Sequence, residues 1–494
     1  MRFIKLLATA SVIGSPVRTP AEEQPRAWGL VASAADWVAR APDQIEKIEA
    51  PFAMPPLDRP VFRDQVFNIA DYGAQGDGIT KNTEAFRKAI AACSAAGGGK
   101  VLVPTGKWLT GAIHMKSNIN LHMEAGAEIH FSDDPADYLP VVFQRWAGLE
   151  VMNYSPLIYA LDCENIAVTG PGRLFGHGRR WQSWFKSEQS SSGSMLRIYH
   201  DLVLKNIPVE QRVFGTEGGA FGDPRHPGLR PSFIQPVRCR NVLLEGFTIQ
   251  GYGPFWTIHP TYCENVIIRG VRVHTQGGHN ADGIDLDSTR NVLVEYCYLD
   301  TGDDAIVVHT GTNAEGRRIG MPTENVVVRH IMVLGGHGGM VIGSLTSGGV
   351  RSILVHDCTY DGTQRGIRLK SNKSRGGVVE NLWYRDITMR GIKDEAIVIE
   401  TDYKAALPAG ADQADYPTFR NITIENVTCH GAPVAASLIG TDEAPIENLV
   451  MKNVSVQAAK GMHFRSVRGL NLINVNVKVS DGIPMTFTNC EEVQ

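Results

Sequence analysis

Four short polar signatures follow one another between residues 280 and 370. They are Asn280-Ala281-Asp282, Asp303-Asp304, Gly336-His337-Gly338 and Arg368-Leu369-Lys370. Each comes about one strand and one turn after the previous signature. A chain that coils into stacked rungs would therefore bring them together at roughly the 4.8 Å spacing of neighbouring strands. We expect three carboxyl groups, an imidazole and two cations to form one surface.

The carboxyl groups suit the cleavage of a glycosidic bond. Cleavage with inversion needs a protonated acid beside the leaving oxygen and a carboxylate that holds a water, about 6.5–9.5 Å apart. Asp282 and Asp303 are 21 residues apart in the sequence, close to one rung, and we expect adjacent rungs to reach that distance. Because crowded carboxylates repel each other, one should stay protonated near neutral pH, and Asp303 is the expected acid. An Asp-Asp pair on its own would more often be a turn.

The other two signatures supply hydrogen bonds and positive charge. His337 is flanked by glycines and can hydrogen-bond the carboxylates, which would influence their protonation. Arg368 and Lys370 are two residues apart on an expected strand, so their side chains share a face. A positive patch of this kind favours an anionic ligand such as an acidic sugar, because an arginine fork matches a carboxylate. Three further cations lie around this pair but could belong to a solvated turn: Arg365, Lys373 and Arg375.

A repeated segment predicts the elements that hold these residues. Segments of the form Asn-apolar-x-apolar recur mostly at intervals of roughly 22 to 34 residues, in the range of solenoid repeats. Each opens a short β-branched run that is typical of a strand, and no run is long enough to be a crossover helix. The sequence therefore predicts an all-β fold, a right-handed parallel β-helix. The segments begin at Asn165, Asn241, Asn265, Asn291, Asn325, Ser352, Asn381, Asn421 and Asn448.

The chain is expected to have three sections. Residues 1–23 have the character of a weak secretory signal, which would make the protein periplasmic or secreted, although an ordinary flexible terminus is the alternative. Residues 24–66 are rich in Ala and Pro and should form a leader segment on the side of the solenoid. Residues 67–494 should form one catalytic β-helix domain. Within it, a helical pattern over residues 82–96 predicts a helix that caps the open first rung.

Composition excludes several classes of protein. The net charge of −4 over 494 residues argues against a nucleic-acid partner, which would need a basic surface. No apolar stretch reaches the roughly 18 residues of a membrane span, so no membrane partner is expected, and we expect a monomer. Of eight cysteines, three occupy equivalent positions before repeat starts: Cys163, Cys239 and Cys263. We interpret these cysteines as buried packing rather than metal ligands, and disulfides stay open.

The four signatures together resemble those of glycoside hydrolase family 28 polygalacturonases, whose pattern is Asn-Thr-Asp, Asp-Asp, Gly-His-Gly and Arg-Ile-Lys. The similarity extends from Phe67 to the C-terminus. It implies a pectin-lyase-like solenoid that hydrolyses α-1,4-galacturonosyl linkages of pectin with inversion, without a metal or other cofactor. The partner would be an acidic polysaccharide or oligogalacturonide.

The resemblance also implies roles for individual residues. Asp303 would be the general acid, Asp282 and Asp304 would activate the water, and His337 would support the site. Arg368 and Lys370 would bind the substrate carboxylate, and we add two neighbours as substrate-binding candidates, Asn280 and Gly338.

Some features depart from that pattern or extend it. His309 stands where we expect a lysine before Ser-Gly, which removes a permanent cation near the site. The stretches 186–236 and 311–320 read as long loops that could wall off one end of a binding groove. Because Gly316-Arg317-Arg318-Ile319-Gly320 also looks like bacterial exo-acting members, we favour exo action. Three tryptophans are sugar-stacking candidates, with core packing as the alternative: Trp146, Trp184 and Trp256.

Other functions stay open. Within the same family, the substrate could be rhamnogalacturonan or xylogalacturonan. A calcium-dependent pectate lyase would use a similar solenoid but cleave by β-elimination. A non-catalytic polysaccharide-binding solenoid would need the positive surface but not the carboxyl trio.

Overall fold

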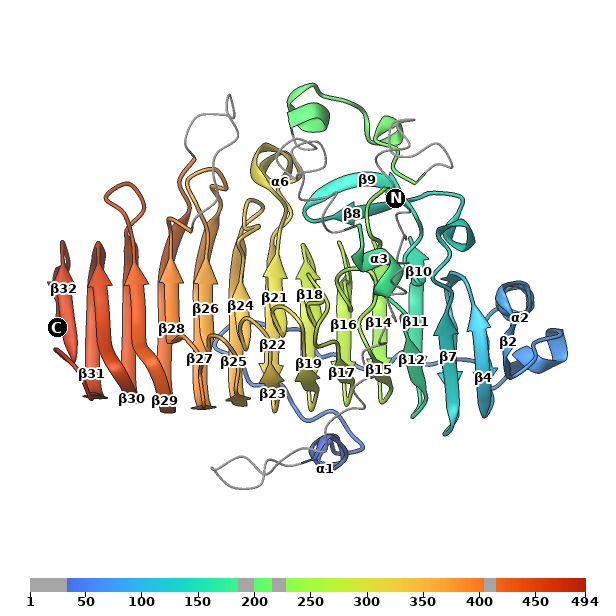
Figure 1. Ribbon diagram of the computed structural model, residues 1–494, viewed down its shortest axis with the longest axis horizontal. Helices are drawn as coiled ribbons and strands as arrows, with labels where there is room; N and C mark the ends of the chain where they lie inside the picture. The colour runs from blue at the N-terminus through green and yellow to red at the C-terminus, as the bar shows by residue number, and fades with distance from the viewer. Residues whose placement is uncertain (1–32, 185–199, 216–227, 404–414) are drawn as a thin grey trace, which may run out of the picture.

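The computed structural model describes residues 33–184, 200–215, 228–403 and 415–494. Its strands stack side by side along one axis, from helix α2 at one end to the C-terminus at the other (Figure 1). Successive turns of the coil pair in parallel. The predicted right-handed parallel β-helix is confirmed. The expected signal, residues 1–23, lies outside the described residues.

Three parallel sheets run along the coil. The first contains β1 (Val66–Asn68), β3 (Gly99–Val103), β6 (Ile119–Met123), β11 (Glu164–Thr169), β14 (Arg240–Glu245), β16 (Glu264–Arg269), β19 (Arg290–Glu295), β22 (Thr323–Arg329), β25 (Val350–Asp361), β27 (Val378–Arg390), β29 (Thr418–Ile439), β30 (Ile446–Arg465), β31 (Val467–Val479) and β33 (Glu491–Val493). The second contains β2 (Asp77–Lys81), β4 (Gly106–Thr110), β7 (Ala127–Phe131), β12 (Arg173–Phe175), β15 (Thr248–Gln250), β17 (Arg272–His274), β20 (Tyr298–Asp300) and β23 (Met332–Gly335), and continues into β25. The third contains β5 (Ile113–His114), β10 (Ile158–Leu161), β13 (Ile234–Val237), β18 (Ile284–Asp287), β21 (Ile306–His309), β24 (Met340–Ile342), β26 (Ile367–Lys370), β28 (Glu395–Glu400) and β32 (Met485–Thr488).

Alternation along each strand separates the core from the outer surface. In β18, Ile284 and Leu286 point into the apolar core that runs the length of the coil. Asp285 and Asp287 alternate with them and point the other way, because successive side chains of a strand face opposite sides. The third sheet therefore presents charged side chains on its outer face.

The repeat starts form an asparagine ladder on the first sheet. Each asparagine has a φ between 53° and 58°, a left-handed conformation that Asn tolerates better than most residues. From Asn118 to Asn325, each side-chain amide donates to the amide oxygen of the preceding rung at 2.9 to 3.1 Å. Ser352 interrupts the ladder, which resumes from Asn381 to Asn448. The predicted stacking of the repeats is thus visible bond by bond.

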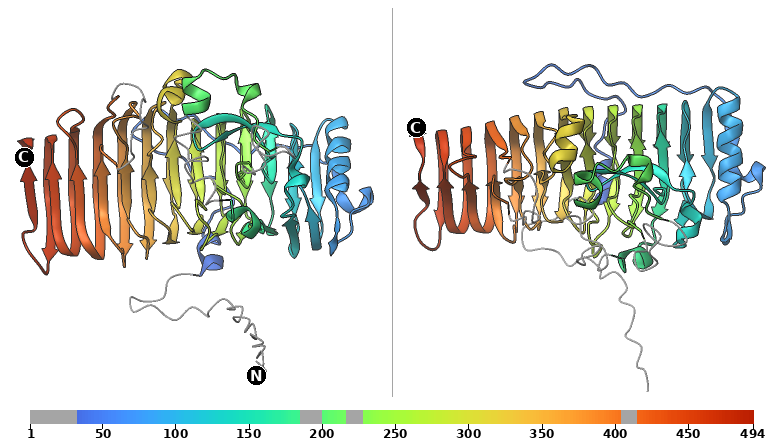
Figure 2. Two further views of the ribbon diagram at one scale, coloured as in Figure 1. Left: turned by 45° about the horizontal axis from the view of Figure 1, so that its top comes forward. Right: turned by 90° about the horizontal axis from the view of Figure 1, so that it is seen from above.

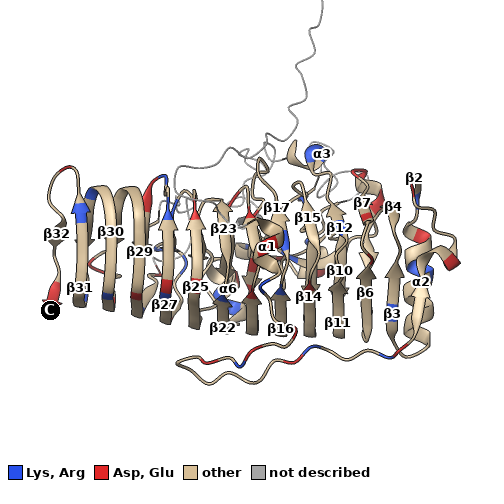
Figure 3. Cartoon of the chain, turned by 90° about the horizontal axis from the view of Figure 1, so that it is seen from below, with Lys and Arg blue, Asp and Glu red and all other residues tan. Residues whose placement is uncertain are grey.

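Both the first rung and one side of the coil are covered. Helix α2 (Thr83–Ala95) buries Phe86, Ile90 and Cys93 against the first strands, so the predicted capping helix is confirmed. Residues 33–66 run along the solenoid as an extended segment that begins with α1 (Ala34–Val38) (Figures 2 and 3). Trp37 donates its indole N–H to the carbonyl of His330 at 3.0 Å. This segment carries charges of both signs, as does the rest of the coil (Figure 3).

Two elements of the third sheet's outer side were not predicted. The segment 311–320, expected to be a loop, contains helix α6 (Asn313–Ile319). An antiparallel hairpin, β8 (Val142–Trp146) and β9 (Leu149–Asn153), lies on the same side of the coil (Figure 1). The remaining short helices are η1 (Ile69–Tyr72), η2 (Pro135–Tyr138), α3 (Arg179–Gln182), η3 (His200–Leu204) and η4 (Val209–Gln211).

The cysteines agree with the packing interpretation. All eight lie within the described residues as free thiols, seven of them buried. Cys163, Cys239 and Cys263 belong to the core, and none of the three is in a group that could hold a metal ion among the described residues. Among the described residues, no helix is both long and apolar enough to span a membrane.

Candidate active site

Adjacent rungs of the third sheet bring the four signatures together. Asp282 precedes β18, Asp303 and Asp304 precede β21, and His337 precedes β24, while Arg368 lies within β26. These four strands pair in order, with Ile284, Ile306, Met340 and Ile367 in register. One oxygen from each of the three carboxyl groups lies within 4.8 Å of the others. The structure therefore places the predicted carboxyl trio beside the predicted histidine and cations.

The spacing of the carboxyl groups is shorter than expected. The sequence predicted about 6.5–9.5 Å between acid and base, whereas the nearest oxygens of Asp282 and Asp303 are within 4.8 Å. The reason is that both side chains sit at the same edge of paired strands, where one rung adds only about 4.8 Å. A short spacing of this kind does not by itself indicate inversion.

Asp304 is the carboxylate tied to the cations. Its oxygens accept hydrogen bonds from Lys370 Nζ at 2.8 Å and from Arg368 Nη1 at 3.3 Å. Burial raises the pKa of Asp304, but the charges of Lys370 and then Arg368 outweigh burial and hold that pKa below its usual value. Asp304 is therefore ionised at neutral pH, as a base that binds water must be.

Asp282 is the carboxyl whose surroundings favour a proton. It is 4 % exposed, and burial, followed by the negative charges of Asp303 and Asp285, raises its pKa well above the usual value. Crowding thus keeps a proton on the trio, as the sequence predicted. Of the three carboxyl groups, Asp282 is the one whose surroundings favour this proton.

Asp303 faces solvent and pairs with His337. The Asp303 side chain is 19 % exposed and that of His337 is 49 % exposed, so both can meet a ligand. His337 Nδ1 lies 2.8 Å from Asp303 Oδ1. This hydrogen bond raises the pKa of His337, which favours the imidazolium. Of the three carboxyl groups, Asp303 is the most accessible, while Asp304 and Asp282 lie behind it.

Asn280 and Gly338, the two further substrate-binding candidates, are both closely held by their neighbours. The Asn280 amide oxygen accepts a hydrogen bond from Arg230 Nη2 at 2.9 Å, and Arg230 is only 1 % exposed. A Cβ on Gly338 would lie 2.5 Å from Val341 Cγ2 and 3.4 Å from Asp304 Oδ1. Only glycine fits this close approach, so the position shapes the site around Asp304.

Several sequence candidates lie away from the trio or are already engaged. Arg365 pairs with Glu395 at 2.9 Å, and the Arg375 guanidinium donates to the Ser344 carbonyl at 3.0 Å. Lys373 is exposed. Trp146 and Trp256 are buried, which favours core packing over sugar stacking. Trp184 packs at the edge of the main core.

Sequence reasoning missed a group of buried polar residues next to the trio. Asp285 lies on β18 and is fully buried, with a pKa that burial and the charge of Asp304 raise well above the usual value. His309, singled out only as a departure, stacks on Trp256 with ring centroids 4.6 Å apart. Two groups could therefore hold a metal ion: Asp282, Asp303 and Asp304; and Asp282, Asp285 and His309. The alternation of Asp285 with two core residues was the available signal.

The hairpin and α6 both lie at the C-terminal ends of β18 and β21, whereas the carboxyl trio lies at the N-terminal ends of these strands. We call the hairpin and α6 together the wall. Arg145 of β8 is fully buried and pairs with Asp287, at the end of β18, at 2.8 Å. Apolar residues of the hairpin pack with residues 202–203, Phe255 and Leu345 in one cluster, against which α6 also packs. Arg212 joins the segment before β13 to α6 through Glu315 at 2.7 Å. A strand of four residues is about 13 Å long, so this wall stands about one strand length from the carboxyl trio.

Comparison with protein families matches most of the chain. Residues 224–490 match the model of Glycosyl hydrolases family 28. Residues 66–127 match a model described as Rhamnogalacturonase A/epimerase, pectate lyase-like.

Individual relatives are similar over most of their length. An exo-poly-alpha-D-galacturonosidase from Dickeya chrysanthemi is 27% identical over 464 residues, which cover 87% of this chain and 74% of the relative. The solved structure of a hyperthermoactive exopolygalacturonase from Thermotoga maritima is 38% identical, with a TM-score of 0.77 over 85% of this chain and 94% of that one. A family 28 exopolygalacturonase from Yersinia enterocolitica is 25% identical, with a TM-score of 0.73 over 87% of this chain and 78% of that one.

Proposed function

Because the chain belongs to glycosyl hydrolase family 28, we propose that it hydrolyses the α-1,4-galacturonosyl linkages of pectin or polygalacturonate. The observation that carries this proposal is the carboxyl trio within 4.8 Å next to Arg368 and Lys370. Carboxyl groups supply acid and base for glycoside cleavage, and two cations on the same outer face suit a uronic acid carboxylate. The named activities of the Dickeya and Thermotoga relatives support the same substrate class.

In this mechanism Asp303 gives its proton to the leaving oxygen. Its exposure lets it reach the substrate, and the His337 imidazolium holds its carboxyl group in place. The proton that crowding keeps on the trio can pass from Asp282 to Asp303 through one bridging water, because their oxygens are within 4.8 Å. Asp304, kept ionised by Lys370, takes the proton of the attacking water, and Asp282, ionised once its proton has moved to Asp303, helps to hold that water.

Arg368 and Lys370 have a double role. Their charges lower the pKa of Asp304 and remain available on one side to a substrate carboxylate. The ring of Tyr403 lies 5.7 Å from the Arg368 guanidinium and 5.6 Å from Lys370 Nζ. This aromatic face can position the two cations and pack against a sugar ring.

The stereochemical outcome is inversion in this proposal. The alternative outcome is retention of configuration. The short spacing of the carboxyl groups suits it, because a carboxylate about 5–5.5 Å from the acid acts as a nucleophile in retaining enzymes. Proton magnetic resonance on freshly cleaved trigalacturonate distinguishes the two outcomes. A β-anomer as the first product supports inversion, whereas an α-anomer would assign the nucleophile to Asp282 or Asp304.

Exo action follows from the wall formed by the hairpin and α6. The wall stands at the ends of β18 and β21, fixed by the buried pair of Arg145 and Asp287. A polymer that meets such a wall can be cleaved only near a terminus. Product analysis on oligogalacturonides of defined length tests this directly. Release of monomer or dimer from the start supports exo action, and a random ladder of products would show endo action.

Assays on polysaccharide substrates distinguish three other functions. Faster hydrolysis of rhamnogalacturonan or xylogalacturonan than of polygalacturonate would identify that polysaccharide as the substrate, within the same family. An unsaturated, ultraviolet-absorbing product that needs calcium would identify a lyase. Tight polysaccharide binding without any new reducing ends would identify a binding protein.

The remaining expectations complete the proposal. We propose that the reaction needs no metal or other cofactor, that the protein acts as a monomer, and that it works in the periplasm or outside the cell.

A further inference from the structure

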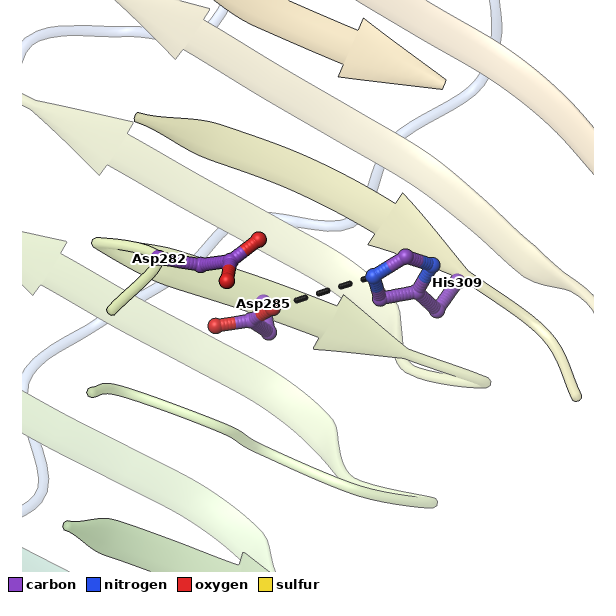
Figure 4. Close-up of side chains that lie close together, drawn as sticks. All are labelled: Asp282, Asp285 and His309. Carbon is purple, nitrogen blue, oxygen red and sulfur yellow. Dashed lines mark ion pairs between the residues drawn. The ribbon is translucent and has the colours of Figure 1, made fainter. Parts of the chain in front are cut away.

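A second cluster of polar side chains shares Asp282 with the carboxyl trio. It contains Asp282, Asp285 and His309, which come from the rungs of β18 and β21 and lie on the same side of the sheet (Figure 4). One ligand atom from each lies within 4.8 Å of the others. His309 Nε2 is 3.7 Å from Asp285 Oδ1.

The cluster holds buried polar atoms that lack hydrogen bonds. Asp285 is 0 % exposed and His309 is 5 % exposed. Within the described part of the chain, both oxygens of Asp285 and Oδ1 of Asp282 have no hydrogen-bond partner. A buried carboxyl group or imidazole without a partner costs free energy. Such atoms point to a ligand that would satisfy them.

The surroundings leave one nitrogen of His309 free for such a ligand. Trp256 covers the face of the imidazole, at 14° between the ring planes, and the Nε2 edge of the ring faces Asp285 at 3.7 Å. In the tautomer that carries its proton on Nδ1, Nε2 has the lone pair that a metal ligand needs. Lys370 is engaged with Asp304 at 2.8 Å.

We propose that Asp282, Asp285 and His309 form an inhibitory site for one divalent cation of the zinc type. One imidazole and two carboxylates match the ligands of zinc sites that keep a fourth position open to water. The ion would displace any proton on Asp282 and Asp285 when it binds, and the two carboxylates would then balance its charge. Ligand atoms of a tetrahedral zinc site lie roughly 3.3 Å apart, so the 3.7 Å between His309 and Asp285 needs a shift of only a few tenths of an ångström.

The imidazole selects the type of ion. Nitrogen ligands favour zinc, nickel and copper over calcium and magnesium, which prefer oxygen. Inhibition follows because Asp282 would bind the ion instead of the attacking water. The ion would be a competitor at this site and not a cofactor of the reaction. The inhibition rests on the proposed function, whereas the binding of the ion does not.

The test combines zinc binding with turnover. The whole protein, freed of metal by dialysis against a chelator, is titrated with zinc in a calorimeter and assayed on polygalacturonate at the same zinc concentrations. The variants are His309→Gln and Asp285→Asn, with circular dichroism to confirm folding. The matched control is His177→Gln, because exposed His177 lies 3.0 Å from His130 and this surface pair could bind zinc on its own.

We expect micromolar zinc to bind and inhibit the unchanged protein and His177→Gln. His309→Gln and Asp285→Asn should each weaken binding and inhibition by at least about 100-fold, since loss of even an outer partner costs 10–100-fold. Equal zinc affinity in His309→Gln, or equal inhibition by calcium, would overturn the proposal. Zinc binding that depends on His309 in a protein without hydrolase activity would keep the site and refute the proposed function.

Discussion

The same rungs stack polar side chains in two contrasting ways. On the first sheet, the asparagines from Asn165 to Asn291 each donate to the preceding ladder asparagine and accept from the next, at 2.9 to 3.1 Å. On the third sheet, stacking brings together carboxyl groups that cannot donate to one another once ionised. The ladder pairs its side-chain amides with one another, whereas the site leaves Asp282 and Asp285 with unpartnered oxygens. Identical stacking therefore stabilises the fold on one face and prepares reactivity on another.

The largest expected effect is on turnover at the site. Asp303→Asn keeps the size of the side chain but removes the proton that the leaving oxygen needs. We expect kcat on polygalacturonate to fall by about 10³–10⁴-fold, with binding of oligogalacturonides and the unfolding midpoint nearly unchanged. Reducing-sugar release at the normal rate would refute the assignment of Asp303 as the acid.

Lys370→Met should change the pH dependence of turnover. Because the pKa of Asp304 is lowered in the folded protein, its ionised form is kept above its usual value of about 3.9 and is lost as pH falls through the lowered pKa. Without Lys370 that pKa should rise, so the acid limb of kcat/KM moves to higher pH. We also expect kcat/KM at its optimum to fall by about 10²-fold, since a buried charge pair is broken. An acid limb that does not move would contradict the coupling of Lys370 to Asp304.

The pairing of Asp303 with His337 predicts a linked change in pKa. The hydrogen bond to Asp303 raises the pKa of His337, so the bonded imidazolium is complete below the usual value near 6.5 and is lost as pH rises through the raised pKa. In Asp303→Asn the pKa of His337 should fall, which a nuclear magnetic resonance titration of its ring protons can measure. A His337 titration that is the same in Asp303→Asn as in the unchanged protein would contradict the pairing.

The smallest effect belongs to the ladder and concerns stability alone. Asn291→Ala removes two amide hydrogen bonds and places alanine at a φ of 55°. We expect the free energy of unfolding to fall by about 2–3 kcal/mol, of which about 1 kcal/mol comes from the left-handed backbone. Asn291→Gly should recover that backbone part, and both variants should keep the normal kcat at low temperature. A large loss of kcat in the folded Asn291→Gly protein would show that the ladder also supports turnover. That result would contradict the contrast between the stabilising first sheet and the reactive third sheet.

The sequence predicted what the repeat controls. The asparagine at the start of each repeat predicted the rungs. Stacking of the rungs then predicted that the trio, His337, Arg368 and Lys370 lie together. The predicted spacing of the carboxyl groups was too long. The sideways offset between rungs depends on where each turn ends, and the residue types alone do not reveal that position. The ring that stacks on His309 belongs to Trp256, 53 residues away in the sequence. Trp256 in turn packs in one cluster with the hairpin, whose alternation is too weak to reveal it in the sequence. Helix α6 was missed because its seven residues contain a glycine and are too short for a periodic pattern.

The central claim is that stacked aspartates beside a pair of cations add water to a galacturonosyl linkage. The most direct test is mass spectrometry of the products of trigalacturonate cleavage in water enriched in heavy oxygen, with a chelator present. We predict one heavy oxygen at C1 of the newly formed reducing end and no unsaturated product. An unsaturated product without the label, or no cleavage of any galacturonide, would contradict the account.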